Sequence, residues 1–166
     1  MDVLRINFSR VLFHLAALFC AVSSCQAKEG LADYNEMELS GKLKEPNEKF
    51  TLRVRCLPSN RKVNVASIHG ADGEQPKCLT DLLLLTVNGN RIEIHRDAYQ
   101  DLGAIHIPLG ISVSRRQKNF VINVSGGDGA SSFRARIFTD NQRALYREID
   151  ELDKSGELKT SHQELK

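Results

Sequence analysis

The chain has 166 residues, a formal net charge of +2 and no tryptophan. Its basic residues are spread along the chain, which argues against nucleic-acid binding, because such proteins gather many phosphate contacts in one region. The length suits one domain that buries its own apolar core.

The first 27 residues resemble a secretory signal peptide. Arg5 and Arg10 precede the apolar run 11–22, and small residues follow it. This run is shorter than the ~20 apolar residues that a membrane-spanning helix needs. We therefore expect an exported protein, located in the bacterial periplasm or held at the outer membrane as a lipoprotein.

Two processing sites compete in this segment. The letters CQA place small residues where cleavage after Ala27 requires them. The letters VSSC resemble the bacterial lipobox, in which the cysteine is lipidated, although leucine is commoner than valine at its first position. Cys25 is therefore the lipidation candidate, with a signal over 1–24, and a soluble product cut after Ala27 is the alternative. Residues 28–47 are expected to form an N-terminal tether and to contain a first strand.

Two cysteines, Cys56 and Cys78, remain beyond the signal segment. An exported chain meets an oxidising compartment, where a pair of thiols becomes a disulfide. Two lone cysteines are too few for a zinc site, and the chain has no Cys-x-x-Cys redox motif. The sequence therefore predicts a Cys56–Cys78 disulfide, worth ~3 kcal/mol in the chain-entropy model.

Residues 48–150 read as a succession of short strands. Apolar and polar residues alternate there with a period of two, the pattern of half-buried strands. Strands are predicted over 50–56, 62–68, 81–87, 91–96, 104–114, 119–125 and 133–139.

The connections between these strands carry clear turn signals. Asn88-Gly89 predicts a hairpin between the third and fourth strands, and the Gly- and Pro-rich segment 69–77 predicts an exposed loop. Asp97 is expected to cap one helical turn that ends near Gly103. Pro108 lacks a backbone donor, which predicts an edge strand or a bulge around it.

Residues 140–154 fit two structures. Asp140 can cap a helix, or Asp140-Asn141 can form the turn of another hairpin. We favour the hairpin because the pair directly follows a strand. Residues 151–166 are polar and are expected to form a loose tail. The predicted fold is all-β, an antiparallel sandwich or barrel of about seven to eight short strands, with a short C-terminal helix as the alternative.

The sequence offers no recognisable catalytic set, metal site or cofactor site. The Gly-rich loop 126–129 opens a strand rather than a helix, so we expect a turn that needs positive φ, not a phosphate cradle. His95 and His106 could meet at a metal with Asp97 or Glu93 if their strands were neighbours. The simpler explanation is that both histidines lie at the surface. A metal site requires a set number of ligands in a set geometry, and the spacing of these residues in the sequence does not indicate one.

Four arginines lie on the polar faces of predicted strands: Arg53, Arg55, Arg134 and Arg136. If these strands share a sheet, the four side chains form a basic stripe. The arginine fork suits carboxylate- or phosphate-bearing partners because it can donate two parallel hydrogen bonds. The alternative is that they solvate the wet face of an antiparallel sheet.

The expected function is that of a non-catalytic binding or accessory domain, with membrane contact only through its signal peptide or lipid anchor. Its expected partner is another exported protein or a cell-envelope component, not nucleic acid. The alternative is a small periplasmic inhibitor or immunity-type protein that blocks a cell-wall enzyme, with the loop 69–78 as its contact. An enzyme or a metal protein is the least expected class.

Overall fold

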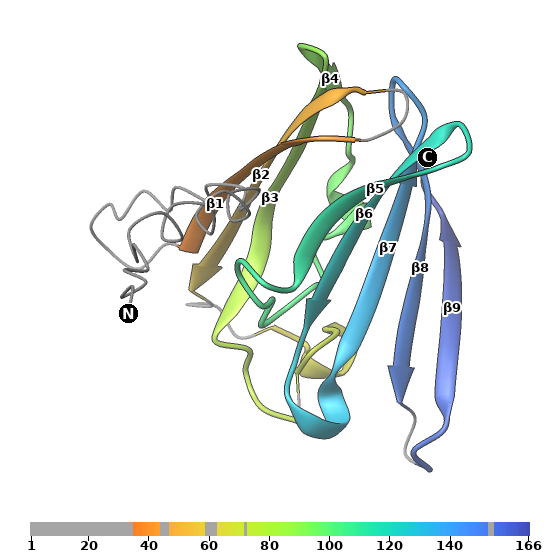
Figure 1. Ribbon diagram of the computed structural model, residues 1–166. Coiled ribbons are helices and arrows are strands. Elements are labelled where there is room, and N and C mark those ends of the chain that lie inside the picture. Colours follow the sequence, from red (N-terminus) through yellow and green to blue (C-terminus); the bar gives the residue numbers. More distant parts are fainter. Residues whose placement is uncertain (1–34, 44–46, 59–62, 72, 153–154) are drawn as a thin grey trace, which may run out of the picture.

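The computed structural model describes residues 35–43, 47–58, 63–71, 73–152 and 155–166. Within these ranges the chain forms nine strands in two antiparallel sheets (Figure 1). The four-stranded sheet contains, in spatial order, β1 (Asn35–Lys42), β2 (Lys49–Pro58), β3 (Cys78–Val87) and β4 (Asn90–Ile92). The five-stranded sheet contains β5 (Ile111–Arg116), β6 (Asn119–Gly126), β7 (Phe133–Thr139), β8 (Ala144–Leu152) and β9 (Leu158–Glu164). The all-β prediction is confirmed.

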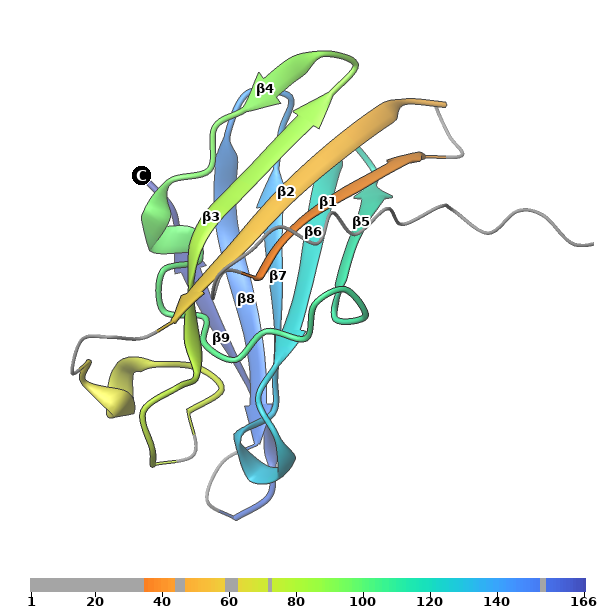
Figure 2. The ribbon, with the colours of Figure 1, turned by 90° about the vertical axis from the view of Figure 1, so that its left-hand side faces the viewer.

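The two sheets lie face to face and share one apolar core (Figure 2). The alternation in β2 turns Leu52 and Val54 inward, and the alternation in the other sheet turns Ile122 and Ile137 toward them. All four side chains are fully buried. The period of two in the sequence therefore marks the inner face of each sheet correctly.

The continuous apolar run in β3 has a simple explanation. Leu83 and Leu85 are buried in the core, whereas Leu82 and Leu84 lie half-buried on the outer face. There they stand opposite Arg55 and Arg53 of β2. The long arginine stems can cover apolar side chains at such positions while their charged heads remain in water.

The predicted hairpin between β3 and β4 is present, with Asn88 and Gly89 both at positive φ in its turn. The fourth strand is only three residues long, shorter than the predicted 91–96. After Ile92 the backbone changes partners, because Glu93 bonds to Gln142 and Ala144 of the other sheet. The chain therefore crosses between the sheets where a longer strand was expected.

The predicted strand over 62–68 is wrong. Val65–Ser67 form a 3₁₀ turn, stabilised by the Ser67 hydroxyl donating to the Asn64 carbonyl. The physical reason lies in the sheet order: β2 already pairs with β1 on one side and β3 on the other. A strand directly following β2 would find no free edge beside it.

The segment 104–114 also departs from the prediction. Only its second half is a regular strand, β5, which does lie at a sheet edge. Residues 106–110 form a tight loop in which Gly110 N–H donates to the His106 carbonyl, and the Ile107–Pro108 peptide bond is cis. The expected helical turn is a 3₁₀ turn over Arg96–Ala98, with His95 rather than Asp97 in the cap position.

The hairpin prediction for 140–154 is confirmed, and the helix alternative is wrong. The Asp140 carboxylate accepts hydrogen bonds from the N–H groups of Gln142 and Arg143 at 2.7 Å each, which builds the turn before β8. The expected loose tail is wrong as well, because its last part forms β9, paired with β8 along all seven residues. The free edge of β8 provides hydrogen-bonding partners for this segment, and the composition of the segment does not reveal them.

The predicted disulfide is present. Cys56 and Cys78 have Cα atoms 5.6 Å apart and join the end of β2 to the start of β3, 22 residues later. β1 lies within the segment expected to contain a first strand. The signal-peptide and lipidation predictions, Cys25 included, fall on residues outside the described ranges.

Candidate functional site

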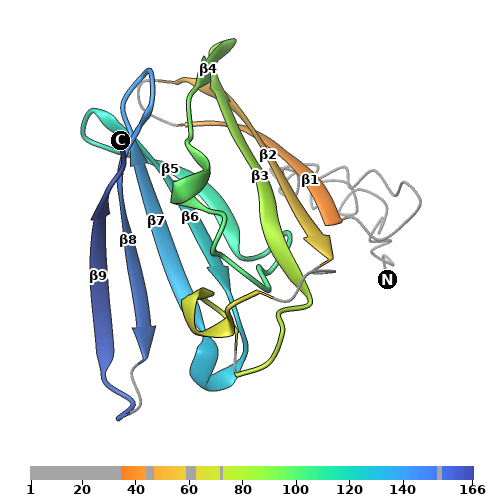
Figure 3. The ribbon, with the colours of Figure 1, turned by 180° about the vertical axis from the view of Figure 1, so that it is seen from behind.

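The four arginines do not form one basic stripe. Arg53 and Arg55 lie on β2 in the four-stranded sheet, whereas Arg134 and Arg136 lie on β7 in the five-stranded sheet. All four point away from the core, and the outer faces of the two sheets look in opposite directions (Figures 1 and 3). The stripe prediction required one shared sheet and is therefore wrong.

Three of these arginines are held by neighbouring carboxylates. Arg53 donates to Glu36 at 2.6 Å, and Arg55 donates through two nitrogens to Asp81 at 2.5 and 3.1 Å. Cross-strand pairs of this kind compensate the charge of an open sheet face. The outer face of the four-stranded sheet therefore presents little uncompensated charge at these positions.

Arg136 makes hydrogen bonds to two carboxylates. Its guanidinium donates to Glu148 at 3.0 Å and to both carboxylate oxygens of Asp150 at 2.8 and 3.0 Å. Partial burial works against its charge, but these hydrogen bonds outweigh that effect and raise the pKa of Arg136. Arg136 is therefore a structural member of the ladder between β7 and β8.

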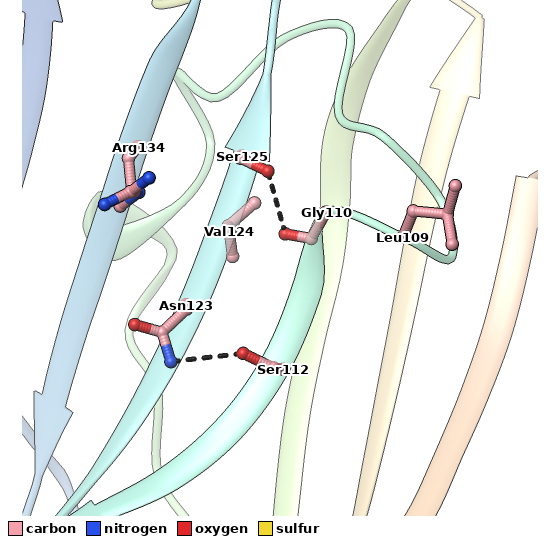
Figure 4. Close-up of a pocket in the computed structure, with 7 residues that line it drawn as sticks. All are labelled: Leu109, Gly110, Ser112, Asn123, Val124, Ser125 and Arg134. Carbon is pink, nitrogen blue, oxygen red and sulfur yellow. Dashed lines mark hydrogen bonds between the residues drawn. The ribbon is translucent and has the colours of Figure 1, made fainter. Parts of the chain in front are cut away.

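Arg134 differs from the other three. Its side chain is exposed, and within the described part of the chain it forms no ion pair. It lies between two depressions on the outer face of the five-stranded sheet, of about 290 and 420 Å³, and Ser125 and Arg134 line both. We call the two together the Arg134 groove. The first part is lined by Leu109, Gly110, Ser112, Asn123, Val124, Ser125 and Arg134 (Figure 4). The second part is lined by His106, Ser125, Gly126, Ser132, Phe133, Arg134, Asp150, Glu151, Leu152 and Leu158.

The floor of the first depression consists of small polar side chains. Asn123 Nδ2 donates to the hydroxyl of Ser112 at 3.3 Å, and the Ser125 hydroxyl donates to the Gly110 carbonyl at 3.3 Å (Figure 4). A Cβ atom at Gly110 would lie 2.6 Å from the Ser125 carbonyl oxygen, so only glycine allows the loop 106–110 to approach β6 this closely. The sequence feature that forms this wall is a glycine directly before an edge strand.

Arg134 makes no ion pair among the described residues, and it lies opposite Asp150 in the register of β7 and β8. Asp150 is engaged by Arg136, and Glu151 contacts His69 Nδ1 at 2.6 Å, so both carboxylates of the lining have basic partners elsewhere. His106, in turn, lies 3.7 Å from Asp128. Among the described lining residues, Arg134 is the charged side chain that makes no ion pair, so its guanidinium has donors available for an anionic group.

Both ends of the groove carry exposed apolar side chains. Leu109 is 95% exposed at the tip of its loop, and Leu158 is 68% exposed at the start of β9. Leu109 lies in the predicted strand 104–114, but the structure places it in the loop before β5. The sequence signal that indicates a loop here is the position of Leu109 between Pro108 and Gly110, two residues typical of turns.

A second polar cluster lies on the inner side of the same sheet. Arg147 is 7% exposed and donates to both oxygens of Asp101 at 2.5 and 2.6 Å. Its Nε donates to Gln163 at 2.7 Å, and His69 lies between Glu151 and Asp101. These contacts tie the loops at 69 and 101 to β8. The sequence shows His69 only as the first residue of the predicted exposed loop 69–77, because its partners are distant along the chain.

The metal hypothesis receives no support from the placement of the histidines. His95 lies 3.2 Å from Asp97, and His106 lies beside Asp128 in a different part of the sandwich. Within the described ranges, no three metal-binding side chains come together.

The glycine-rich loop is a turn, as predicted, with Gly127 and Gly129 at positive φ. In the same ranges, every helix is too short and too polar to cross a bilayer.

Comparison with known proteins gives no relative: no protein-family model, no curated protein and no solved structure matches the chain.

Proposed function

We propose that this protein is an exported, non-catalytic binding domain that holds an anionic group of its partner in the Arg134 groove. The observation that carries the proposal is the guanidinium of Arg134, which makes no ion pair among the described residues and lies in a groove whose carboxylates contact other basic side chains. The Ser112 hydroxyl, which accepts a hydrogen bond from Asn123, keeps its own proton to donate to the same ligand. A carboxylate or phosphate group of another exported protein or of a cell-envelope component fits this chemistry.

The polar groups of the groove support binding rather than catalysis. The Ser125 hydroxyl donates to the Gly110 carbonyl, and His106 faces Asp128. In the described structure these two side chains therefore do not form the hydrogen-bonded nucleophile and base of a hydrolase. The groove offers a cation and neutral donors, the composition of a recognition site.

Export is supported by two independent features. The N-terminal pattern is that of a signal peptide, and the Cys56–Cys78 disulfide is compatible with an oxidising compartment. Mass spectrometry of the mature N-terminus tests the two processing routes: a lipidated Cys25 establishes a membrane anchor, and an unmodified Lys28 establishes a soluble product. A mature protein that begins at Met1 would overturn the export proposal.

The groove is tested by partner capture. Immobilised protein is incubated with a periplasmic and envelope extract, and the captured material is compared for wild type, Arg134→Gln and Arg116→Gln. Arg116 is an exposed arginine at the far end of β5, so its substitution makes the same change of charge away from the groove. We expect Arg134→Gln to lose most of the captured partner and Arg116→Gln to retain it. Equal capture by all three proteins would refute the proposal.

Small anions provide a second test of the same groove. Titration with acetate and, separately, with inorganic phosphate should shift the NMR resonances of the Arg134 side chain and of the Ser125 amide. Both shifts should vanish in Arg134→Gln. The anion that acts at the lower concentration distinguishes a carboxylate ligand from a phosphorylated one.

The inhibitor alternative is favoured by one specific observation, the exposure of Leu109. Its loop is closed by two backbone hydrogen bonds, from Gly110 to His106 and from Ile111 to Pro108. An apolar side chain presented by a constrained loop suits insertion into an enzyme cleft, because little conformational entropy remains to be lost on binding. The predicted contact loop 69–78 is tied down at both ends, by His69 and by Cys78, with Glu74 and Gln75 exposed between them.

Inhibition assays against lysozyme and amidase separate the two functions. If the inhibitor alternative holds, Leu109→Ser should weaken inhibition strongly, and Leu158→Ser, which removes a comparable exposed leucine, should not. Wild-type protein that leaves both activities unchanged at high excess would remove the case for an inhibitor of these two enzymes.

A further inference from the structure

The last strand, β9, has an unusual environment. It forms the edge of the five-stranded sheet, and all seven of its residues are exposed. Figures 1 and 3 show that β9 stands beside β8 at the margin of the molecule, away from the four-stranded sheet. Lys159, Ser161 and Gln163, which would face the core in a central strand, therefore lie at the surface.

The free side of β9 is suited to pairing with another strand. In an antiparallel strand, backbone N–H and C=O groups that do not bond to one neighbour point to the other side. Proteins usually protect such an edge with proline, a bulge, a very short strand or charged side chains, inward-pointing ones included. β9 has no proline, and its register with β8 runs without a shift from Leu158 to Glu164. Lys159 is its one charged side chain on the core-facing side, so a partner strand has to oppose Lys159 with a side chain that is not basic. By contrast, the edge strand β4 has three residues.

We propose that a second copy of this chain pairs with β9 in antiparallel orientation, about a two-fold axis at Ser161. This register pairs the strand with itself along its whole length. Ser161 faces its own copy, and the other opposed pairs are Leu158 with Glu164, Lys159 with Gln163 and Thr160 with His162. No pair opposes two like charges, so no opposed side chains repel each other in this register. A two-fold interface of this kind closes on itself and joins the two five-stranded sheets edge to edge.

The pairing also has a consequence for the Arg134 groove. Leu158 lines the groove and lies on β9. In the paired arrangement, Glu164 of the second copy lies opposite Leu158, at the end of the groove. The dimer interface does not depend on the function proposed for the groove, and the two are tested separately.

Sedimentation velocity over a range of concentrations tests the pairing. Wild type should show a monomer–dimer equilibrium. Ser161→Lys places two lysines opposite each other at the axis, and it should weaken dimerisation about fivefold or more. Ser114→Lys is the matched control, since Ser114 is an exposed serine on β5, the other edge of the same sheet. It should dimerise like wild type.

A mixing experiment identifies the occupant of the edge. Ser161→Lys and Ser161→Glu should each be weakened or monomeric alone, and an equimolar mixture should recover the dimer, because only two copies that meet at residue 161 bring these charges together. Thermal unfolding of each variant confirms that the fold is intact. Wild type that remains monomeric at every concentration, or a mixture that recovers no dimer, would overturn the proposal.

Discussion

The guanidinium of Arg147 on β8 donates two parallel hydrogen bonds to the carboxylate of Asp101, 46 residues earlier in the chain. Asp101 lies in the connection between the two sheets, and Arg147 is buried on the inner side of the five-stranded sheet. The pair therefore fixes the long crossover onto the sandwich. It also shows how polar groups enter the inner side of this small domain, with each charge opposed and hydrogen-bonded.

Removal of the Asp101 carboxylate should lower the free energy of unfolding. Asp101→Ala leaves the buried Arg147 charge without its partner, and we expect a loss of about 3 kcal/mol in the free energy of unfolding. Glu36→Ala removes the partner of the exposed Arg53 and should cost less than about 1 kcal/mol. Urea denaturation of both variants measures the difference. Equal losses would show that burial of the first pair does not determine its contribution.

The disulfide should contribute substantially to stability. Replacement of both Cys56 and Cys78 by alanine removes the constraint on the 22-residue segment and should cost about 3 kcal/mol. A reducing agent should lower the melting temperature of wild type and leave that of the double variant unchanged. Insensitivity of wild type to the reductant would contradict the crosslink as a source of stability.

Two buried threonines should respond in opposite ways to the same substitution. The Thr139 hydroxyl is buried and has no hydrogen-bond partner among the described residues, whereas the Thr80 hydroxyl donates to the Leu102 carbonyl at 2.8 Å. Thr139→Val should stabilise the protein by up to about 1 kcal/mol, because it removes an unsatisfied polar group. Thr80→Val should destabilise it by about 1–2 kcal/mol. Chemical denaturation gives both values, and destabilisation by Thr139→Val would point to a partner for that hydroxyl.

The turn before β8 should lose stability in acid. Hydrogen bonds from the N–H groups of Arg143 and Gln142 lower the pKa of Asp140 from its ordinary value of 3.8. The folded state therefore binds this proton less readily than the unfolded state, so the stabilisation is complete above pH 3.8 and is lost as pH falls through the lower, folded pKa. In the Asp140→Asn variant, the side-chain amide oxygen would still accept the two hydrogen bonds, but the amide does not titrate.

The stability of Asp140→Asn should therefore depend less on pH than that of wild type in this acidic range. Urea denaturation at a series of pH values compares the two proteins, and NMR titration of the Asp140 carboxyl carbon gives its pKa directly. A carboxyl that titrates at or above 3.8 in the folded protein would contradict this account.

Local patterns alone are enough for several parts of this fold. β2 follows from strict alternation and β6 and β7 follow from alternation over most of their length, because a strand with one buried face repeats every two residues whatever its neighbours are. The β3–β4 hairpin follows from Asn88-Gly89, whose backbone preferences are local. The disulfide follows from the number of cysteines, since only Cys56 and Cys78 lie beyond the expected signal segment.

The remaining features depend on which segments become neighbours in space. Segment 62–68 has the alternation of a strand but no free edge beside the preceding strand β2, and β9 has the composition of a tail but pairs with the edge of β8. Sheet assignment separates Arg134 from Arg53, and the nearby carboxylates form their ion pairs with other side chains, so Arg134 lines the groove without an ion pair among the described residues. Hydrogen bonds between strands and ion pairs between distant residues are long-range contacts, so a pattern of near neighbours in the chain does not specify them.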